Sequence, residues 1–585
     1  MGSISTVNSL NGRTFFRLRP SFHFLAPGGW MNDPCAPGYD SHSRKYHLFY
    51  QWNPHDCDWG NISWGHAVSD NLITWSYTAM EPLLKPDAFY DKKGIFTGCF
   101  HPTGIHGEPD QLTVFYTSVC HLPVHWSISN MRGAEGLSVA TSKNGGSTWE
   151  KLIDNPILKE EPDGFDVTGF RDPALAEWPE MDELRGEKAL YGLISGGIQG
   201  AGPNVFLYAI DPTDLRRWRY LGTLFESIKN SKISRRWSGD YGLNFECSNF
   251  MALQSGSVSR DFLITGTEGG TQRDWIKYSP GSPERTVRWC VWLSGSLTKQ
   301  DDEIKLNSQF GGILDHGVFY AANSFYDPVT EQRILWGWIP EEDVTLDYCR
   351  AKGWNGSLAL PREVFLLVIP NVTRALATPL SEITSVAQHR ESDGSLSLHT
   401  LGIRPLAALN SLRRKSLASL HNISLPSALS TIHSTAIRST QWELSATISI
   451  TSACEQVGFH LRHNPGFSTK TTVSFVPPTE DIIVDRSQSN PSTKINKFYE
   501  RGPFTLFTQR INGQDVQEQL KLRIFCDNDV LEVYANDRFA LTTMIYTDDE
   551  EAVELSLFAD GKAGAAVFDN VTIWEMGGIG LSAQV

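Results

Sequence analysis

Long apolar runs are absent from this sequence. No segment approaches the roughly 18 consecutive apolar residues of a membrane-spanning helix, and the first 20 residues lack the apolar stretch of a secretory signal. We therefore expect no membrane span, and an intracellular location is favoured over a secreted one. Five Asn-X-Ser/Thr sequons would instead suit secretion. They begin at Asn61, Asn355, Asn371, Asn422 and Asn570.

Closely spaced metal-ligand pairs are also missing. The nine cysteines are scattered, and none forms a CxxC pair, which excludes a zinc ribbon and a thioredoxin-like site. The 16 histidines show no HExxH spacing, and the glycine-rich segment 195–203 does not fit the dinucleotide-binding fingerprint. The sequence therefore predicts neither a metal nor an organic cofactor.

Positive charge is the scarcer sign. Lys and Arg number 51 against 66 Asp and Glu, so the net charge is −15. An acidic surface argues against binding to nucleic-acid phosphates or to an anionic membrane. Aromatic residues, by contrast, make up 11% of the chain and include 18 Trp. We expect a small, neutral ligand as partner, and the oligomeric state is left open, with a homodimer among the options.

Short apolar and aromatic runs separated by turn residues dominate the chain. Examples are YHLFYQW, LTVFYTSV and RILWGWI, each bounded by Gly, Pro, Asn or Asp. This pattern is typical of strands and tight turns rather than of helices. Two stretches, 379–390 and 407–419, are the candidates for short helices. The predicted fold class is therefore all-β.

A weak repeat refines this prediction. Similar segments end at Trp75, Trp149 and Trp218, and each consists of an apolar strand, a polar turn and a Trp that opens the next strand. Repeated units of this kind favour the radial sheets of a β-propeller, and at about 70 residues per unit roughly five units fill the first 370 residues. Three unrelated hairpins are the alternative.

The last 150 residues show a different pattern, in which apolar and polar residues alternate. Eight alternating runs, from ELSATISI to AAVFDNVTIWEM, are separated by turns and predict a β-sandwich. We therefore expect an all-β chain with a five-bladed β-propeller followed by a C-terminal β-sandwich. The expected domains are a catalytic propeller at 1–375, a linker and start of the sandwich at 376–435, and the sandwich proper at 436–585.

Three acidic residues lie in unusual settings. Asp33 follows WMN and precedes Pro, Asp172 lies between Arg171 and a Pro, and Glu246 lies in the apolar segment NFECS. Each residue alone is more often structural, because Asp-Pro is a common turn dipeptide. Together they suit glycoside hydrolysis, which needs one ionised carboxylate and one carboxyl group of raised pKa.

The segments around these acids resemble glycoside hydrolase family 32, the family of invertases, inulinases, levanases and fructosyltransferases. The matching blocks, in order, are WMNDP at 30–34, YHLFYQWNP at 46–54, WGHAVSDNLITW at 64–75, FTG at 96–98, RDP at 171–173 and FEC at 245–247. The C-terminal segments VDRS and LEVYAND are similar to the β-sandwich of the family. The resemblance implies a five-bladed propeller plus a sandwich over most of the chain.

The resemblance also implies roles for individual residues. Asp33 would be the nucleophile, Glu246 the general acid/base, and Asp172, beside Arg171, would bind fructose hydroxyls and stabilise the transition state. The other residues that match sugar-binding positions are Asn32, Gln51, Trp59, Phe96, Thr97, His125, Trp126, Glu268, Glu341 and Glu342. The chain departs from the family pattern in the segment 286–292. Fungal transfructosylating members tend to have a His there, and the matching position in this chain is Arg288 or a neighbouring residue.

The predicted function is that of a retaining β-D-fructofuranosidase. It would act on sucrose and short fructo-oligosaccharides through a covalent fructosyl-enzyme, by hydrolysis and by transfructosylation. Two alternatives stay open. One is an inverting propeller glycosidase of the arabinan- or xylan-cleaving type, and the other is a non-catalytic carbohydrate-binding homologue.

Overall fold

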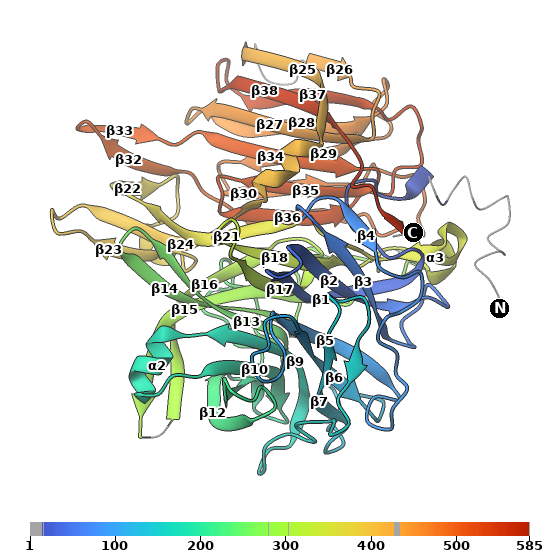
Figure 1. Ribbon diagram of the computed structural model, residues 1–585. Helices are drawn as coiled ribbons and strands as arrows, with labels where there is room; N and C mark the ends of the chain where they lie inside the picture. Colours follow the sequence, from blue (N-terminus) through green and yellow to red (C-terminus); the bar gives the residue numbers. More distant parts are fainter. Residues whose placement is uncertain (1–14, 16, 279, 302, 426–432, 584–585) are drawn as a thin grey trace.

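The computed structural model of the protein describes residues 15, 17–278, 280–301, 303–425 and 433–583. Strands and their connecting loops make up nearly all of it, which confirms the all-β prediction (Figure 1). Helices are few and short, and they include α2 (Pro179–Arg185) and α3 (Leu346–Lys352). In the described ranges, no helix has the length and apolar character needed to cross a membrane.

The prediction of short helices at 379–390 and 407–419 is only partly confirmed. Only two short 3-10 helices form there, η2 (Leu380–Glu382) and η3 (Ala407–Leu412). Each is followed by a strand, β23 (Ala387–Arg390) and β25 (Arg413–Ser424) respectively. These strands pair with β24 (Leu396–Pro405) and β38 (Ala566–Met576). Pairing with a neighbouring strand thus overrides a weak local preference for helix.

Five sheets follow one another along the first 405 residues. The first strand of each sheet contacts the first strand of the next, and β17 returns to contact β1, so the five sheets close into a ring. This ring, coloured blue to yellow, forms the lower part of Figure 1.

The bounds of the strands in the ring are as follows. The first two sheets contain β1 (Gly29–Asp40), β2 (Lys45–Asn53), β3 (Ser63–Ser69) and β4 (Trp75–Tyr77), then β5 (Gly94–His101), β6 (Leu112–Val119), β7 (Glu135–Ser142) and β8 (Glu150–Lys151). The next two contain β9 (Val167–Glu177), β10 (Leu190–Ile198), β11 (Gly202–Ile210) and β12 (Trp218–Glu226), then β13 (Asn244–Ser255), β14 (Val258–Glu268), β15 (Trp289–Gln300) and β16 (Glu303–Asp315). The fifth contains β17 (Tyr320–Asp327), β18 (Gln332–Ile339), β20 (Ser357–Leu358), β21 (Arg362–Ile369), β24 and β23.

The strands in the middle of these sheets are buried on both faces. Every residue of β6, with the sequence LTVFYTSV, is buried. Sheets stacked around a ring cover each other's faces, so an inner strand has no solvent side that would favour alternating polar residues. This packing explains the continuous apolar runs seen in the sequence.

The three tryptophans of the sequence repeat occupy equivalent positions. The indole Nε1 of Trp75, Trp149 and Trp218 donates a hydrogen bond to the backbone carbonyl three residues earlier, at 3.0, 3.0 and 3.1 Å. Trp75 and Trp218 open β4 and β12, and Trp149 directly precedes β8. Each ring therefore closes the turn that leads into the fourth strand of its sheet, as the repeat predicts.

Two six-stranded sheets form the sandwich, at the top of Figure 1. One contains β25, β38, β27 (Gln441–Ile450), β34 (Leu520–Asp527), β35 (Val530–Ala535) and β36 (Phe539–Met544). The other contains β26 (His433–Ala436), β37 (Glu554–Gly561), β28 (Cys454–His463), β29 (Thr471–Val476), β30 (Asp481–Asp485) and β31 (Glu500–Pro503). All eight strands predicted in this region are present. A further sheet of β22 (Val372–Ala375), β32 (Phe507–Ile511) and β33 (Gln514–Gln517) pairs the segment that follows β21 with the sandwich half of the chain.

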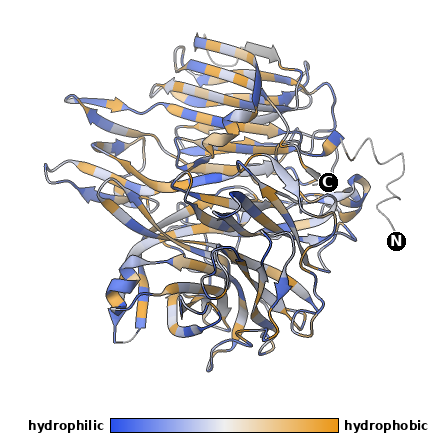
Figure 2. Ribbon diagram, in the orientation of Figure 1, coloured by the Kyte–Doolittle hydropathy of each residue, from blue (hydrophilic) through white to orange (hydrophobic). Residues whose placement is uncertain are grey.

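Apolar side chains hold the ring and the sandwich together. One core fills the space between the two sandwich sheets and includes Trp442 and Phe459. A larger core contains Trp336 of the ring together with Phe525 and Tyr546 of the sandwich. Figure 2 shows the alternation of apolar and polar residues along the sandwich strands that such a two-faced packing requires. The second of these cores therefore joins the two parts.

Segments from the ends of the described chain also cross between the two parts. The backbone N–H groups of Ser21, Phe22 and His23 donate to the carboxylate of Asp527 at 2.7–2.9 Å. Strand β39 (Ser582–Ala583), which follows the sandwich in the chain, pairs in parallel with β4 of the ring. The short strand β19 (Trp354–Asn355) also pairs in parallel, with β1, and it completes the first ring sheet. Within 376–435, β23 and β24 extend the fifth ring sheet, whereas β25 belongs to the sandwich. The division at 375 and 435 stays a prediction.

Candidate active site

The innermost strand of each ring sheet is irregular beside a residue of the site. The pairing register shifts at Asp33 in β1, at Phe96 and Thr97 in β5, after Arg171 in β9, after Glu246 in β13 and after Tyr320 in β17. A β-bulge of this kind re-aims the side chains beside it. All five irregularities direct polar side chains to one place inside the ring.

Three of these positions carry backbone strain. Asp172, Cys247 and Ala321 have φ values of 60°, 52° and 53°, in the left-handed region that side chains other than Gly rarely adopt. Such a conformation costs of order 1–3 kcal/mol and is found mainly at functional sites. The surrounding sheets must therefore supply the stability that holds these residues in place.

Asp33 accepts hydrogen bonds on both carboxylate oxygens. Thr97 Oγ1 donates to Oδ2 at 2.5 Å, Gln51 Nε2 lies 3.4 Å from the same oxygen, and Asn32 Nδ2 lies 3.3 Å from Oδ1. Burial raises the pKa of Asp33 to about 6, although the bond from Thr97 opposes the shift. Asp33 is therefore ionised at neutral pH yet retains the basicity of a weakly solvated carboxylate.

The guanidinium of Arg171 connects three carboxylates. Its Nε and Nη2 donate to Glu246 Oε1 at 3.0 and 2.9 Å, Nη2 also reaches Glu268 Oε1 at 3.0 Å, and Nη1 reaches Glu135 Oε1 at 3.0 Å. Tyr320 donates to the other oxygen of Glu246 at 2.8 Å. Burial acts against ionisation of Glu246, but Arg171 and Tyr320 outweigh it and lower its pKa. Burial and the charge of Glu246 raise the pKa of Glu268 to about 8.

Asp172 lies between the other two acids. Its Oδ2 accepts the backbone N–H of Cys247 at 3.0 Å, and the Cys247 thiol contacts both Asp172 and Asp33 at 3.5 and 3.6 Å. Burial and the nearby Glu246 raise the pKa of Asp172 well above its ordinary value. Like charges that close together cannot all ionise, so Asp172 gives up its proton less readily than an ordinary carboxyl group.

An open pocket of about 370 Å³ lies above these groups. Aromatic rings form its sides, and Trp59, 47% exposed, lies at its mouth. A polar floor with apolar walls orients a ligand while excluding water. The residues that line the pocket are Trp30, Asn32, Asp33, Gln51, Trp59, Phe96, Val124, His125, Arg171, Asp172, Glu246, Glu268, Arg288, Tyr320, Trp338 and Glu342.

Most of the residues predicted from the sequence lie in this lining, and three do not. Thr97 stands behind Asp33 as its hydrogen-bond donor. Trp126 packs beside His125, with ring centroids 4.8 Å apart. Glu341 is buried and forms an ion pair with Lys352.

Several residues of the site carry little or no signal in the sequence. Tyr320, Trp338, Trp30 and Val124 line the pocket, and Glu135 binds Arg171 from below. Glu135 could have been suspected, because it is an acid that opens an otherwise uncharged strand. Tyr320 carries no such local signal, since its role follows from the closure of the ring.

The arrangement is suited to acid–base and nucleophilic chemistry on one bond. It offers an ionised carboxylate at Asp33 and protons shared among neighbouring acids, all beside apolar surfaces. In the described part of the chain, no group of three or more His, Cys, Asp or Glu side chains is arranged to hold a metal ion.

Two family models match the chain. The model described as the glycosyl hydrolases family 32 N-terminal domain matches residues 23–376, and the one described as glycosyl hydrolases family 32 C terminal matches residues 408–575. The first match covers the pocket, and the second covers most of the sandwich.

Similar proteins are known from plants and fungi. The β-fructofuranosidase, insoluble isoenzyme 2, of Oryza sativa subsp. indica is 31% identical over 378 residues, which cover 63% of this chain and 56% of that relative. This chain thus matches little more than half the length of that curated relative.

Two solved structures resemble the molecule as a whole. Aspergillus kawachii β-fructofuranosidase complexed with glycerol is 30% identical with a TM-score of 0.85, covering 97% of this chain and 95% of that chain. The fructosyltransferase from A. japonicus is 26% identical with a TM-score of 0.85, covering 98% and 97%. The likeness therefore extends over the ring and the sandwich together.

Proposed function

The chain belongs to glycoside hydrolase family 32, and from that premise we propose that it is a retaining β-D-fructofuranosidase. Its donor substrates would be sucrose and short fructo-oligosaccharides, with water or a sugar hydroxyl as acceptor. The single observation that carries the proposal is the meeting of Asp33, Asp172 and Glu246, from three different sheets, around one pocket.

The first chemical step would form a covalent intermediate. Asp33 attacks the anomeric carbon of a terminal fructosyl unit while Glu246 donates a proton to the departing oxygen. Thr97 supports Asp33 in its ionised form, because its hydroxyl donates to Oδ2. Asp172, with Arg171 beside it, would bind fructose hydroxyls and stabilise the transition state.

Glu246 must carry a proton when the glycosidic bond breaks. In the free pocket, Arg171 and Tyr320 favour the ionised form of Glu246. The neighbouring Glu268 also accepts a hydrogen bond from Arg171 Nη2, and its pKa of about 8 means that it is protonated at neutral pH. A sugar hydroxyl that engages Arg171 weakens its hold on Glu246. We propose that substrate binding thereby moves the proton within this acid pair onto Glu246.

The second step would release the sugar. Glu246, now ionised, takes a proton from water or from a sugar hydroxyl, and the acceptor oxygen attacks the anomeric carbon and frees Asp33. Transfer to sugar is supported by the likeness to the A. japonicus fructosyltransferase. The aromatic mouth at Trp59 would favour a sugar acceptor because it offers an apolar face.

We also propose an architecture for this catalytic unit. The five sheets of the ring would be the five blades of a propeller, with the pocket at the central axis. The family-model matches at 23–376 and 408–575 support a catalytic propeller and an accessory sandwich.

The test is to incubate the protein with sucrose at low and high concentration and to quantify free glucose and free fructose. Equal amounts at every concentration indicate hydrolysis, and excess glucose at high sucrose indicates transfer to sugar. Product stereochemistry, followed by NMR, distinguishes retention from the inversion of an arabinan- or xylan-type enzyme. If neither sucrose, inulin nor levan yields hexose, the proposal is wrong and a binding function replaces it.

A further inference from the structure

One wall of the pocket is built from two loop segments. Arg288, at the end of the segment that joins β14 to β15, pairs with Glu342, just after β18, at 2.9 Å. The other oxygen of Glu342 accepts the backbone N–H of Thr286 at 3.1 Å. The Arg288 guanidinium lies 5.4 Å from the ring centre of Tyr320 and 5.7 Å from that of Trp338. The position of Arg288 therefore affects the group that hydrogen-bonds Glu246.

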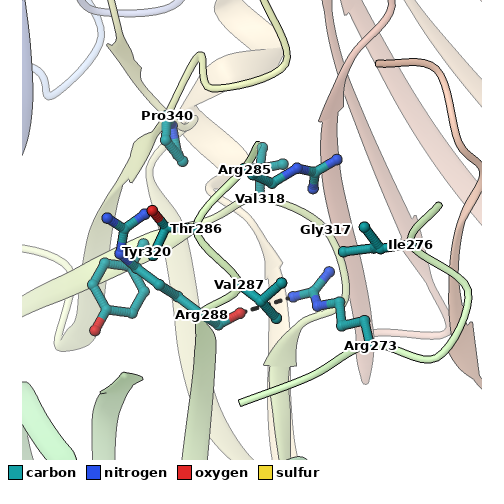
Figure 3. Close-up of a pocket in the computed structure, with 10 residues that line it drawn as sticks. All are labelled: Arg273, Ile276, Arg285, Thr286, Val287, Arg288, Gly317, Val318, Tyr320 and Pro340. Atoms are coloured by element: carbon teal, nitrogen blue, oxygen red, sulfur yellow. Dashed lines mark hydrogen bonds between the residues drawn. The ribbon is translucent and has the colours of Figure 1, made fainter. Parts of the chain in front are cut away.

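The same segment has a second side that faces away from the pocket. Figure 3 shows Arg288 directed toward Tyr320, whereas Arg285 points in the opposite direction, toward the sandwich. Between them lies a small cavity of about 20 Å³. Arg273 closes the lower side by donating to the backbone carbonyls of Arg288 and His316 at 3.2 and 2.9 Å. The segment thus has one functional side and one anchored side.

The anchor on the second side is a residue of the sandwich. Glu500, in β31, accepts from Arg285 Nη2 at 2.7 Å and lies 3.5 Å from both Arg273 Nη1 and Arg486 Nη2. Asp343, next to Glu342, accepts from Arg285 at 3.0 and 3.1 Å and pairs with Arg486 at 2.8 Å. All five side chains are buried. A buried carboxylate shared by three guanidinium groups holds each of them in a narrow range of positions.

A neutral contact joins the same two segments. Asn496 of the sandwich donates from Nδ2 to the carbonyl of Pro283 at 2.6 Å, and its backbone N–H donates to the carbonyl of Asp343 at 2.9 Å. Both segments of the pocket wall are therefore fastened to the sandwich rather than to the ring alone.

We propose that Glu500 is a positioning residue that acts on catalysis through Arg288. Glu500 fixes Arg285 and Arg273 on one side of the segment that joins β14 to β15. It thereby determines the positions of Arg288 and Glu342 on the other side, which faces the pocket. The sandwich would then take part in shaping the pocket instead of serving only as a support. The catalytic consequence rests on the proposed function, whereas the anchoring does not.

The test is a double-mutant cycle on the full chain with Glu500→Gln and Arg288→Gln. If Glu500 acts through Arg288, each single variant lowers kcat/KM by about tenfold, and the double variant is no worse than Arg288→Gln alone, because coupled residues are not additive. Losses that multiply would overturn the proposal. So would a Glu500→Gln variant with wild-type kcat, KM and pH profile.

A matched control separates positioning from general loss of stability. Glu443 is a buried sandwich carboxylate that pairs with Arg413 and Arg523 away from the pocket. Glu443→Gln should lower the thermal midpoint without changing KM or the product ratio. If Glu500→Gln does not fold, Asn496→Ala takes its place, since it removes one hydrogen bond at the same junction.

A second measurement needs no substrate. Hydrogen exchange in Glu500→Gln should rise in the peptides that cover 273–288 and 340–345, and it should stay unchanged there in Glu443→Gln. If exchange rises but the wild type releases no hexose, the anchoring stands and the proposed function fails. If exchange in these peptides is unchanged, the anchoring itself is refuted.

Discussion

Two groups of buried charges, one around the pocket and one between the ring and the sandwich, differ in their balance. Around the pocket the acids outnumber the cations: Asp33, Glu135, Asp172, Glu246, Glu268 and Glu342 against Arg171 and Arg288. At the junction the numbers match when His23 is protonated: Asp315, Asp343, Glu500, Asp527 and Glu532 against His23, Arg273, Arg285, Arg362 and Arg486. Buried acids and arginines therefore form an acid-rich group at the pocket and a charge-balanced group at the junction.

The pKa values follow this balance. At the pocket, burial raises the pKa of Asp33 to about 6, and burial with the charge of Glu246 raises that of Glu268 to about 8. At the junction, Arg362 and His23 overcome burial and lower the pKa of Glu532 to about 2, while Asp527 and Glu532 overcome burial and raise that of His23 to about 9. Unmatched charges thus keep protons available for transfer, and matched charges hold the two parts together.

The largest expected effect concerns the pocket. Asp33→Asn should reduce hexose release by roughly 10⁴-fold or more, because removal of a nucleophile disables the catalytic unit. Its thermal midpoint should stay the same or rise, since a neutral amide is easier to bury than a carboxylate. Initial rates and calorimetry measure both. A variant that keeps more than about one per cent of wild-type activity would show that Asp33 is not the nucleophile.

The next effect concerns the junction, where we expect a loss of stability without a loss of activity. Arg362→Met leaves Asp315 buried without its cation and Glu532 with His23 alone, at a cost of roughly 3–5 kcal/mol in unfolding free energy. Activity per folded molecule should be unchanged. Urea denaturation measures the loss. The control is Arg404→Met, which breaks the partly exposed pair with Glu363 and should cost no more than about 1 kcal/mol.

The contribution of His23 should depend on pH. Its folded-state pKa of about 9 exceeds the ordinary value of 6.5, so its stabilisation is complete below pH 6.5 and is lost as the pH rises through 9. His23→Gln should cost about 2 kcal/mol at pH 6, because it removes hydrogen bonds to two carboxylates. Unfolding free energies measured from pH 6 to 10 test this. A difference between variant and wild type that does not shrink above pH 9 would contradict it.

The smallest effect concerns the acid limb of catalysis. Asp33 must be ionised to act, so kcat/KM should fall as the pH drops through about 6. Thr97→Val removes a hydrogen bond to the ionised form and should move this limb upward by less than about one pH unit. Thr373→Val, at a threonine outside the pocket, should leave the limb in place. An unshifted limb in Thr97→Val would mean that Asp33 does not set it.

Much of the fold was predictable from local pattern. The Trp repeat marks the fourth strands of three sheets because each indole caps the turn before its strand. The eight sandwich strands follow from alternation, since most of them bury one face more fully than the other, although β35 and β36 are buried at every position. The segments 379–390 and 407–419 are only partly helical because each also contributes a strand, β23 to a hairpin with the nearby β24 and β25 to a pair with the distant β38.

The site was only partly predictable. Asp33, Asp172 and Glu246 stand out because they lie in segments of unusual composition. Glu135 gives a weaker signal, as an acid that opens a buried strand, and Tyr320 gives none, since its contact with Glu246 forms only when the ring closes. Glu341 and Glu342 are neighbours in the sequence, yet one pairs with Lys352 and the other with Arg288. No local pattern distinguishes two adjacent acids that face opposite ways.

The parallel pairing of β39 with β4 has a consequence for how the chain is made. Ser582 pairs with Ser76, so the outer strand of the first sheet emerges from the ribosome roughly 25–100 s before its partner at ordinary rates of synthesis. Asp527 likewise appears long after the backbone N–H groups of Phe22 and His23 that it binds. The sheet that is translated first is thus the one completed last. The nascent protein must keep the edge of β4 unpaired, and open to wrong partners, until the whole sandwich has been synthesised.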